Sequence, residues 1–228
     1  MNNMKVATVG LCTLALVGVG CSTKTGTGAL IGTGGGTAVG ALIGALAGNT
    51  AVGAAVGAAV GATAGSLIGK HMDKVAKEAA AQVTNAKVEE VTDANGLTAV
   101  KVTFDNGILF NVGKYALQSS AKTELAKFAT VLKNNTDCQV DIQGYASSDG
   151  SDEVNQVLSA NRANAVKSYL VGTCGVADSQ IKSATGFGET NLVTNADGTE
   201  NVKASRRVEI YLYASQAMID KANNGQLN

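Results

Sequence analysis

The chain lacks tryptophan and proline, and its 228 residues include a single histidine, His71. One histidine cannot build a centre of several histidines, and a nucleophilic serine or cysteine needs a base beside it. Because His71 lies outside the soluble domain delimited below, we predict no enzyme, no metal site and no cofactor. The net charge is zero and the pI is about 6.6, so composition gives no support for a nucleic-acid partner.

The first twenty residues, MNNMKVATVGLCTLALVGVG, have the pattern of an export signal. Lys5 supplies the positive start, and residues 6–19 are apolar or small but too few to span a bilayer. Cys21 follows directly, and the stretch around it resembles a lipobox, although Gly18 replaces the usual leucine-like residue. The resemblance implies an acylated Cys21 and a tether over 21–28. The alternative is a cleaved signal without a lipid.

A regular glycine repeat follows, in a stretch without any charge from Thr25 to Gly69. Glycine recurs at 32, 36, 40, 44 and 48 and then, after one break, at 53, 57, 61, 65 and 69. A period of four places the glycines on one stripe of a helix, where another helix can approach closely. We predict a helical hairpin over 29–69, of a length that suits a bilayer crossing. It resembles glycine-zipper segments of outer-membrane lipoproteins, and a flexible Gly/Ala linker is the alternative.

The next residues predict an amphipathic connector helix over 70–90, because apolar residues recur at helical spacing at Met72, Val75, Ala79 and Val83. His71, at the start of this helix, is expected to be solvated or interfacial.

Residues 91–215 predict an α+β domain, followed by a C-terminal tail over 216–228. Val100, Val102 and Phe104 alternate with polar residues, which indicates a half-buried strand. The expected order is strand, helix, strand, helix, strand, strand, and the segments that show it best are 100–104, 118–134, 138–144, 152–171, 181–186 and 206–213. We predict a mixed sheet with helices on one face, a two-layer sandwich.

Arg162 lies within the helix predicted over 152–171, at a spacing that faces the core. The packed stripe of this helix is predicted to consist of Val154, Leu158, Val166 and Leu170. An unpaired buried charge is very costly, so Arg162 needs either an internal acid or a ligand carboxylate, which a guanidinium binds in bidentate fashion. Asn155 and Ser159 project on the same side as Arg162.

The segments TFDNGILF, IQGYASSDGSDEVNQVLSANRANAVKSYL, IKSATGFGET and ASRRVEIYL resemble the OmpA-like C-terminal domain over residues 98–213. The most specific part is NQVLSANRA at 155–163. The resemblance implies non-covalent binding of peptidoglycan through the diaminopimelate residue of its stem peptide. With the lipobox and the glycine zipper, it implies a lipoprotein of the outer membrane whose soluble domain lies in the periplasm.

The resemblance also implies roles for individual residues. Arg162 and Arg206 should approach the ligand carboxylate, Arg207 should be solvated, and Asn155 could donate or accept a hydrogen bond. The family usually places the aspartate that holds the ligand ammonium where this chain has Ser147, and the first acid is Asp149. Either Asp149 takes that role, or Ser147 and backbone carbonyls do, or binding is weak or directed at another stem-peptide residue.

Cys138 and Cys174 remain as a pair once Cys12 leaves with the signal and Cys21 is assigned to lipid. Cys138 begins a predicted strand and Cys174 follows the helix that returns beside it, so we expect a disulfide in the oxidising periplasm. The alternative is two buried thiols.

These patterns predict a non-enzymatic tether between the outer membrane and peptidoglycan. The alternative is an oligomeric membrane assembly or pore built by the glycine zipper, with the soluble domain positioning it. An envelope hydrolase is disfavoured by the missing base, and DGSDE and NADGTEN lack the ligand spacing of a calcium loop.

Overall fold

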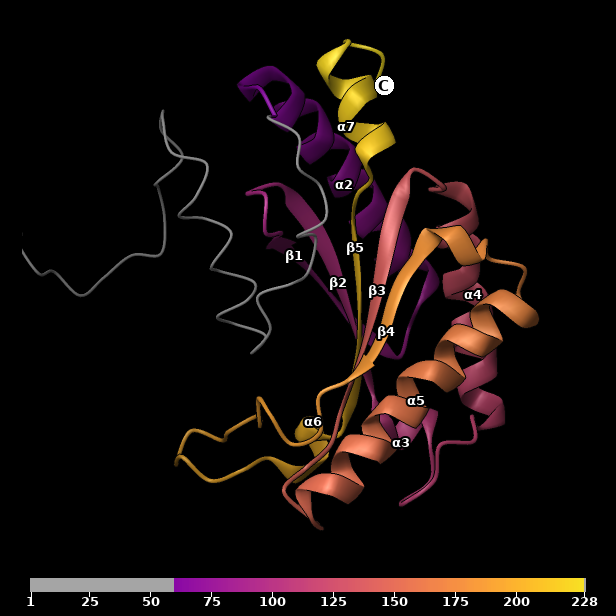
Figure 1. The fold of residues 1–228 in the computed structure, drawn as a ribbon, viewed down its shortest axis with the longest axis vertical. Coiled ribbons are helices and arrows are strands. Elements are labelled where there is room, and N and C mark those ends of the chain that lie inside the picture. The colour runs from indigo at the N-terminus through magenta and orange to yellow at the C-terminus, as the bar shows by residue number, and fades with distance from the viewer. Residues whose placement is uncertain (1–59, 228) are drawn as a thin grey trace, which may run out of the picture. The chain divides into compact units, whose positions relative to one another are not determined.

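The computed structural model describes residues 60–227 (Figure 1). The predicted signal sequence, the acylation site at Cys21 and the predicted hairpin up to residue 59 lie outside the described residues.

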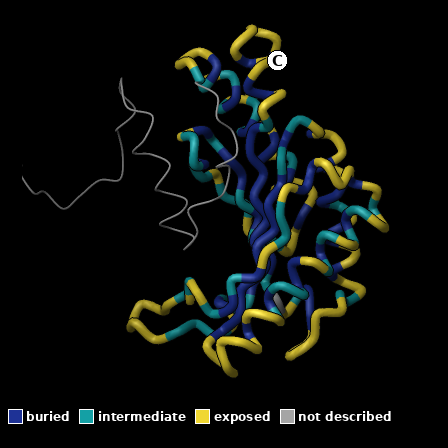
Figure 2. The backbone as a smooth tube through the Cα atoms, viewed as in Figure 1, coloured by how far each residue is buried: buried dark blue, intermediate teal, exposed yellow. Residues whose placement is uncertain are grey.

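A five-stranded mixed sheet forms the centre of the fold, in the order β1-β2-β5-β3-β4. Its strands are β1 (Ala86–Thr92), β2 (Thr98–Asp105), β3 (Cys138–Tyr145), β4 (Ile181–Gly186) and β5 (Arg207–Ala214). β3 and β4 are parallel and all other neighbours are antiparallel. β5, the last strand in the chain, is the central one and is buried along its length (Figure 2).

Three helices and the sheet enclose one apolar core. The helices are α2 (Ala62–Gln82), α4 (Ser119–Asn134) and α5 (Asp152–Gly172), and α4 contacts both of the others. Alternate residues of β5, namely Val208, Ile210 and Leu212, enter this core. The short helices α3 (Asn106–Leu109) and α6 (Val202–Ser205) and the 3-10 turn η1 (Asp178–Gln180) lie in the connections. The predicted α+β class with a mixed sheet is confirmed.

Helix α2 crosses the boundary that the sequence suggested between the glycine repeat and the connector. It runs without a break from Ala62 to Gln82 and buries Ile68, Met72 and Val75. A Cβ atom on Gly69 would lie 3.5 Å from Thr98 Oγ1, and one on Gly65 would lie 4.0 Å from Leu97. A Cβ atom at either position would make only ordinary van der Waals contact, so the last glycines of the repeat face the chain's own domain without being required by the packing. Within residues 60–227, no helix has both the length and the apolarity needed to cross a membrane.

Residues 86–92 form strand β1, where the sequence predicted the end of the connector helix. β1 pairs with β2 through a tight turn, in which the buried Asp93 carboxylate accepts hydrogen bonds from the backbone N–H groups of Asn95 (2.8 Å) and Leu97 (2.9 Å). Val88 and Val91 supply the apolar contacts of β1, which are too sparse for a clear strand pattern.

The predicted C-terminal tail contains a further helix, α7 (Gln216–Asn223). The Ser215 hydroxyl caps it by accepting a hydrogen bond from the Met218 N–H at 3.1 Å. Met218, Ile219 and Ala222 are buried, and α7 contacts α2. The end of the chain is thus part of the core that holds α2.

The predicted disulfide between Cys138 and Cys174 is wrong, because both thiols are free. Cys138 points toward α2, where its Sγ lies 3.8 Å from the Met72 Sδ. Cys174 follows α5, beside Tyr169 and at the end of α4, where its carbonyl accepts a hydrogen bond from Lys133. Cys138 lies against α2 and Cys174 follows α5, and α4 contacts both of these helices. The two thiols therefore do not meet.

Helix α5 lies directly on two glycines that are paired across β3 and β4, Gly144 and Gly186. A Cβ atom on Gly144 would come closer than 3.0 Å to the Ser159 carbonyl, and one on Gly186 would do the same to the Ala160 N–H. The Gln156 side chain donates to the Gly186 carbonyl at 2.7 Å and fixes the register. Both strands therefore need glycine where the helix crosses them.

We predict that Gly186→Ala lowers the free energy of unfolding of the full chain by about 1–3 kcal/mol, because its Cβ atom meets backbone atoms that cannot rotate away. Urea titration followed by circular dichroism measures this. Gly172→Ala, in the last turn of α5 with nothing within 4 Å, is the matched control. It should leave stability unchanged or raise it by up to about 1 kcal/mol. Equal free energies of unfolding for the two variants would contradict the claim that α5 requires glycine at position 186.

Candidate functional site

The buried face of α5 changes character along the helix. Its first half buries the polar side chains of Asn155, Ser159 and Arg162, and its second half buries Val166 and Leu170. The prediction that Arg162 faces inward is confirmed. The predicted packed stripe is wrong in its first half, because Val154 is 61% exposed. Where α5 crosses the paired glycines of β3 and β4, its polar residues face inward instead.

Ser159 fastens α5 to the loop after β4. Its hydroxyl accepts a hydrogen bond from the Gly188 N–H at 2.9 Å and donates to the Gln156 carbonyl at 3.0 Å. With both functions of the hydroxyl used, Ser159 positions its neighbours on the helix face and does not offer a group to a ligand.

Arg162 is 2% exposed, yet its guanidinium makes a single hydrogen bond within the described part of the chain. Its Nε donates to the Lys114 carbonyl at 3.1 Å, and its Cζ lies 5.4 Å from the centre of the Phe110 ring. Within residues 60–227, no carboxylate lies within 4.0 Å of it. An internal acid is therefore not the partner of this cation, and both Nη groups can donate to an incoming acceptor.

The electrostatic surroundings of Arg162 are those of an uncompensated cation. Burial, together with repulsion from the nearby Arg206, lowers the pKa of Arg162 to about 10. The side chain is still protonated near neutral pH. An anion bound here would replace the lost hydration and would relieve the repulsion between the two arginines.

Arg206 follows α6 and is half-buried. Its Nε donates to the Val202 carbonyl at 3.2 Å, so its remaining donors are available to a ligand. Arg206 also acts on Glu200, whose pKa is held below its ordinary value mainly by the hydrogen bond from the Ser148 hydroxyl, with a smaller contribution from Arg206. Arg206 is therefore close enough to act electrostatically on both Arg162 and Glu200.

The adjacent Arg207 was expected to be solvated, and this is wrong. It is 6% exposed, pairs with Glu209 at 2.7 Å and stacks at 4.0 Å from the centre of the Tyr145 ring. The reason is alternation along β5, which turns Arg207, Glu209 and Tyr211 to the sheet face opposite the apolar core, where they are also buried. Arg207 is a structural residue, and Arg206 alone of the pair faces the site.

The loop after β3 brings Ser147, Asp149 and Asn155 together. The hydroxyl of the buried Ser147 donates to the exposed Asp149 carboxylate at 3.1 Å. Asn155 donates to the Ser147 carbonyl at 3.1 Å and to the Glu189 carboxylate at 2.9 Å. Ser148 binds Glu200. This side of the site is therefore acidic, with three carboxylates.

Sequence reasoning missed Glu189 and Glu200. Both lie in the long, largely exposed segment between β4 and α6 (Figure 2), 34 and 52 positions from Asn155 and Ser148, the residues that they contact. No local pattern marks them, because only the arrangement of the strands brings this segment beside the loop after β3. The loop after β3, the start of α5 and helix α6 lie at the same end of the sheet (Figure 1).

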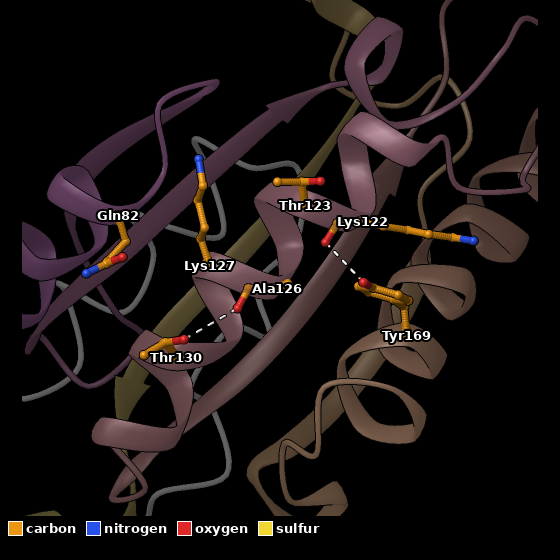
Figure 3. A pocket seen from close by; sticks show the side chains of 7 residues that line it. All are labelled: Gln82, Lys122, Thr123, Ala126, Lys127, Thr130 and Tyr169. Atoms are coloured by element: carbon orange, nitrogen blue, oxygen red, sulfur yellow. Dashed lines mark hydrogen bonds between the residues drawn. The ribbon is translucent and has the colours of Figure 1, made fainter.

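A separate groove lies over the outer side of α4 (Figure 3). Its lining consists of Gln82, Lys122, Thr123, Ala126, Lys127, Thr130 and Tyr169. The Tyr169 hydroxyl donates to the Lys122 carbonyl at 3.1 Å, and the Lys127 ammonium pairs with Glu124 at 2.9 Å. These groups already have partners, and none of the residues predicted to bind a ligand lies here.

Comparison with known proteins bears on both halves of the chain. Residues 109–207 match the OmpA family, and residues 31–76 match the glycine zipper family. Outer membrane porin F of Pseudomonas aeruginosa is 32% identical over 119 residues, 51% of this chain and 34% of that protein. "Probable lipoprotein YiaD" of Escherichia coli is 32% identical over 136 residues, 57% of this chain and 61% of that protein. The chain thus spans between about a third and three fifths of these relatives.

Among solved structures, a MotB-like protein from Desulfovibrio vulgaris matches with a TM-score of 0.54 at 20% identity, over 66% of this chain and 99% of that one. At this identity the likeness shows the shared fold. The sequence matches carry the assignment further: the chain contains an OmpA family domain at residues 109–207, preceded by a glycine zipper at residues 31–76.

Proposed function

We propose that the OmpA family domain binds peptidoglycan non-covalently, through a stem-peptide residue that carries a carboxylate and an ammonium group. The observation that carries this proposal is the buried guanidinium of Arg162, which has no carboxylate partner in residues 60–227. Diaminopimelate is the residue that we expect, because it offers both charged groups on one carbon atom.

The arginine side of the site fits the ligand carboxylate. A buried cation without an acceptor is costly, and a planar guanidinium can donate two parallel hydrogen bonds to one carboxylate. Arg162 offers its two Nη groups, and Arg206 can approach the same anion from α6. Binding would thus compensate a charge that the fold itself leaves without a counterion.

The loop side fits the ligand ammonium. Since Ser147 donates its proton to Asp149 and is itself buried, it can orient the aspartate but adds no charge. Asp149 is exposed and can accept an ammonium, and Asn155 holds Glu189 nearby. We therefore assign to Asp149 the role that the family usually gives to the residue at position 147.

Anchoring would come from the other end of the chain. We propose that residues 1–20 are a signal sequence, that Cys21 carries the lipid, and that residues 21–28 are a tether in front of the zipper. The relatives are named as outer-membrane proteins and a lipoprotein, which supports an outer-membrane location with the domain in the periplasm. The chain would then be a non-enzymatic link between the two layers of the envelope.

A second candidate function is self-association through the glycine repeat, which the match to the glycine zipper family favours. Because Gly65 and Gly69 pack against the chain's own Leu97 and Thr98, the self-associating part should lie within residues 29–60.

Replacing Gly40 and Gly44 by leucine should abolish crosslinked oligomers, since leucine fills the groove through which helices approach. The matched control replaces Ala41 and Ala45 by leucine, off the glycine stripe. Crosslinking of the full chain in membranes measures this. An oligomer that persists in the glycine variant would rule out assembly through the zipper.

Retention on purified peptidoglycan sacculi tests the arginine side. Arg162→Gln should reduce retention about tenfold or more, because a charge-assisted hydrogen bond contributes about 1.5–3 kcal/mol. Retention of Arg162→Lys should lie between that of the unaltered chain and that of Arg162→Gln, since lysine keeps the positive charge but loses the paired planar donors of the guanidinium. Lys182→Ala, which removes an exposed positive charge, is the matched control. Free diaminopimelate should compete. Undiminished retention of a folded Arg162→Gln variant would contradict the proposal.

The same assay separates the interpretations of the loop. Asp149→Asn should weaken retention about tenfold if its charge holds the ammonium, whereas Ser147→Ala should have a smaller effect, through the orientation of Asp149 alone. Asp197→Asn, in the exposed segment before α6, is the control. A larger loss for Ser147→Ala than for Asp149→Asn would show that the hydroxyl and backbone carbonyls bind the ammonium.

A further inference from the structure

Two pairs of residues face each other at the end of the sheet remote from Arg162. His71 and Met72 lie on α2, and Asp137 and Cys138 lie where β3 begins. The ligand atoms of His71, Asp137 and Cys138 all lie within 4.8 Å of one another. Cys138 Sγ also contacts Met72 Sδ at 3.8 Å. The four residues together form what we call the His71 cluster.

His71 has a buried ring nitrogen that lacks a hydrogen-bond partner. Its Nε2 atom is buried without a hydrogen bond, the only such side-chain atom in residues 60–227. The Oδ1 atom of Asp137 is 3.6 Å away, which is too long for a hydrogen bond. The sequence led us to expect a solvated or interfacial histidine and no metal site, but the fold directs this nitrogen toward a carboxylate and a thiol.

We propose that His71 Nε2, an Asp137 carboxylate oxygen and Cys138 Sγ bind a Zn²⁺ ion, with the fourth position beside Met72. Nitrogen, sulfur and oxygen ligands of these kinds bind zinc at about 2.0–2.3 Å, which places neighbouring ligand atoms roughly 3.3–3.8 Å apart in a tetrahedral site. The separation of His71 and Asp137 falls in that range. The side chains of His71 and Asp137 are 17% and 20% exposed, so the ion has a path from solvent.

The charges favour a divalent ion. Zn²⁺ displaces the thiol proton of Cys138, which leaves to solvent as the Zn–S bond forms. The resulting thiolate and the Asp137 carboxylate together neutralise the ion, so no net charge is buried.

Bound zinc would fasten α2 to the start of β3. Since α2 begins within the glycine repeat at residues 31–76, the ion would stiffen the junction between the anchoring part of the chain and the OmpA family domain. This role does not depend on peptidoglycan binding, because the His71 cluster and Arg162 lie at opposite ends of the sheet.

The test uses the full chain, freed of metal and kept reduced with a phosphine. Titration with Zn²⁺ against a chromophoric chelator should show one ion per chain, and the midpoint of thermal unfolding should rise. Co²⁺ should produce a thiolate-to-metal charge-transfer band. His71→Gln and Asp137→Asn, which preserve size, should each weaken zinc binding at least about tenfold. Cys138→Ala should abolish the Co²⁺ band.

Cys12→Ala, Cys21→Ala, Cys174→Ala and Asp73→Asn are the controls, and each should bind zinc as the unaltered chain does. Absence of stoichiometric binding, or a loss in the control variants, would overturn the proposal. So would undiminished binding by a folded His71→Gln chain, which would leave the cluster as a weak histidine–aspartate contact.

Discussion

The direct contact of α5 with Gly144 and Gly186 determines where the α5 residues of the candidate site lie. With no side chain between helix and strands, the first half of α5 meets backbone groups, and its inward face is polar. Ser159 and Gln156 bond to that backbone. Asn155 is thereby placed at the loop after β3, and Arg162 is buried beyond it with its guanidinium uncompensated. A larger residue at either glycine would move both together.

The two ends of the sheet carry different kinds of chemistry. One end collects Arg162, Arg206 and three carboxylates, an arrangement suited to a zwitterion. The other end holds α2 against β1, β2, α4 and α7, and Gly69 and the His71 cluster lie on this part of α2. The helix that leads out of the glycine repeat is therefore integrated into the core.

Much of this architecture could be predicted from the sequence, because alternation in 100–104, 138–144 and 206–213 and helical spacing in 118–134 and 152–171 are local signals. The sequence patterns of β1 and α7 are weaker, because these elements have few apolar residues. Those residues are buried by contact with other elements, chiefly α2 and β2. The inward direction of Arg162 followed from spacing. Glu189, Glu200 and the burial of Arg207 could not be predicted, because they depend on contacts between distant segments. The free thiols of Cys138 and Cys174 depend likewise on the placement of α4.

The proposed site pairs a ligand carboxylate with Arg162 and a ligand ammonium with the loop acids. A crystal structure of the chain soaked with a diaminopimelate-containing stem peptide tests it most directly. We expect the carboxylate to lie within hydrogen-bonding distance of both Arg162 Nη groups and the ammonium to contact Asp149. A stem peptide bound elsewhere, or an Arg162 guanidinium that contacts only protein in the complex, would contradict it.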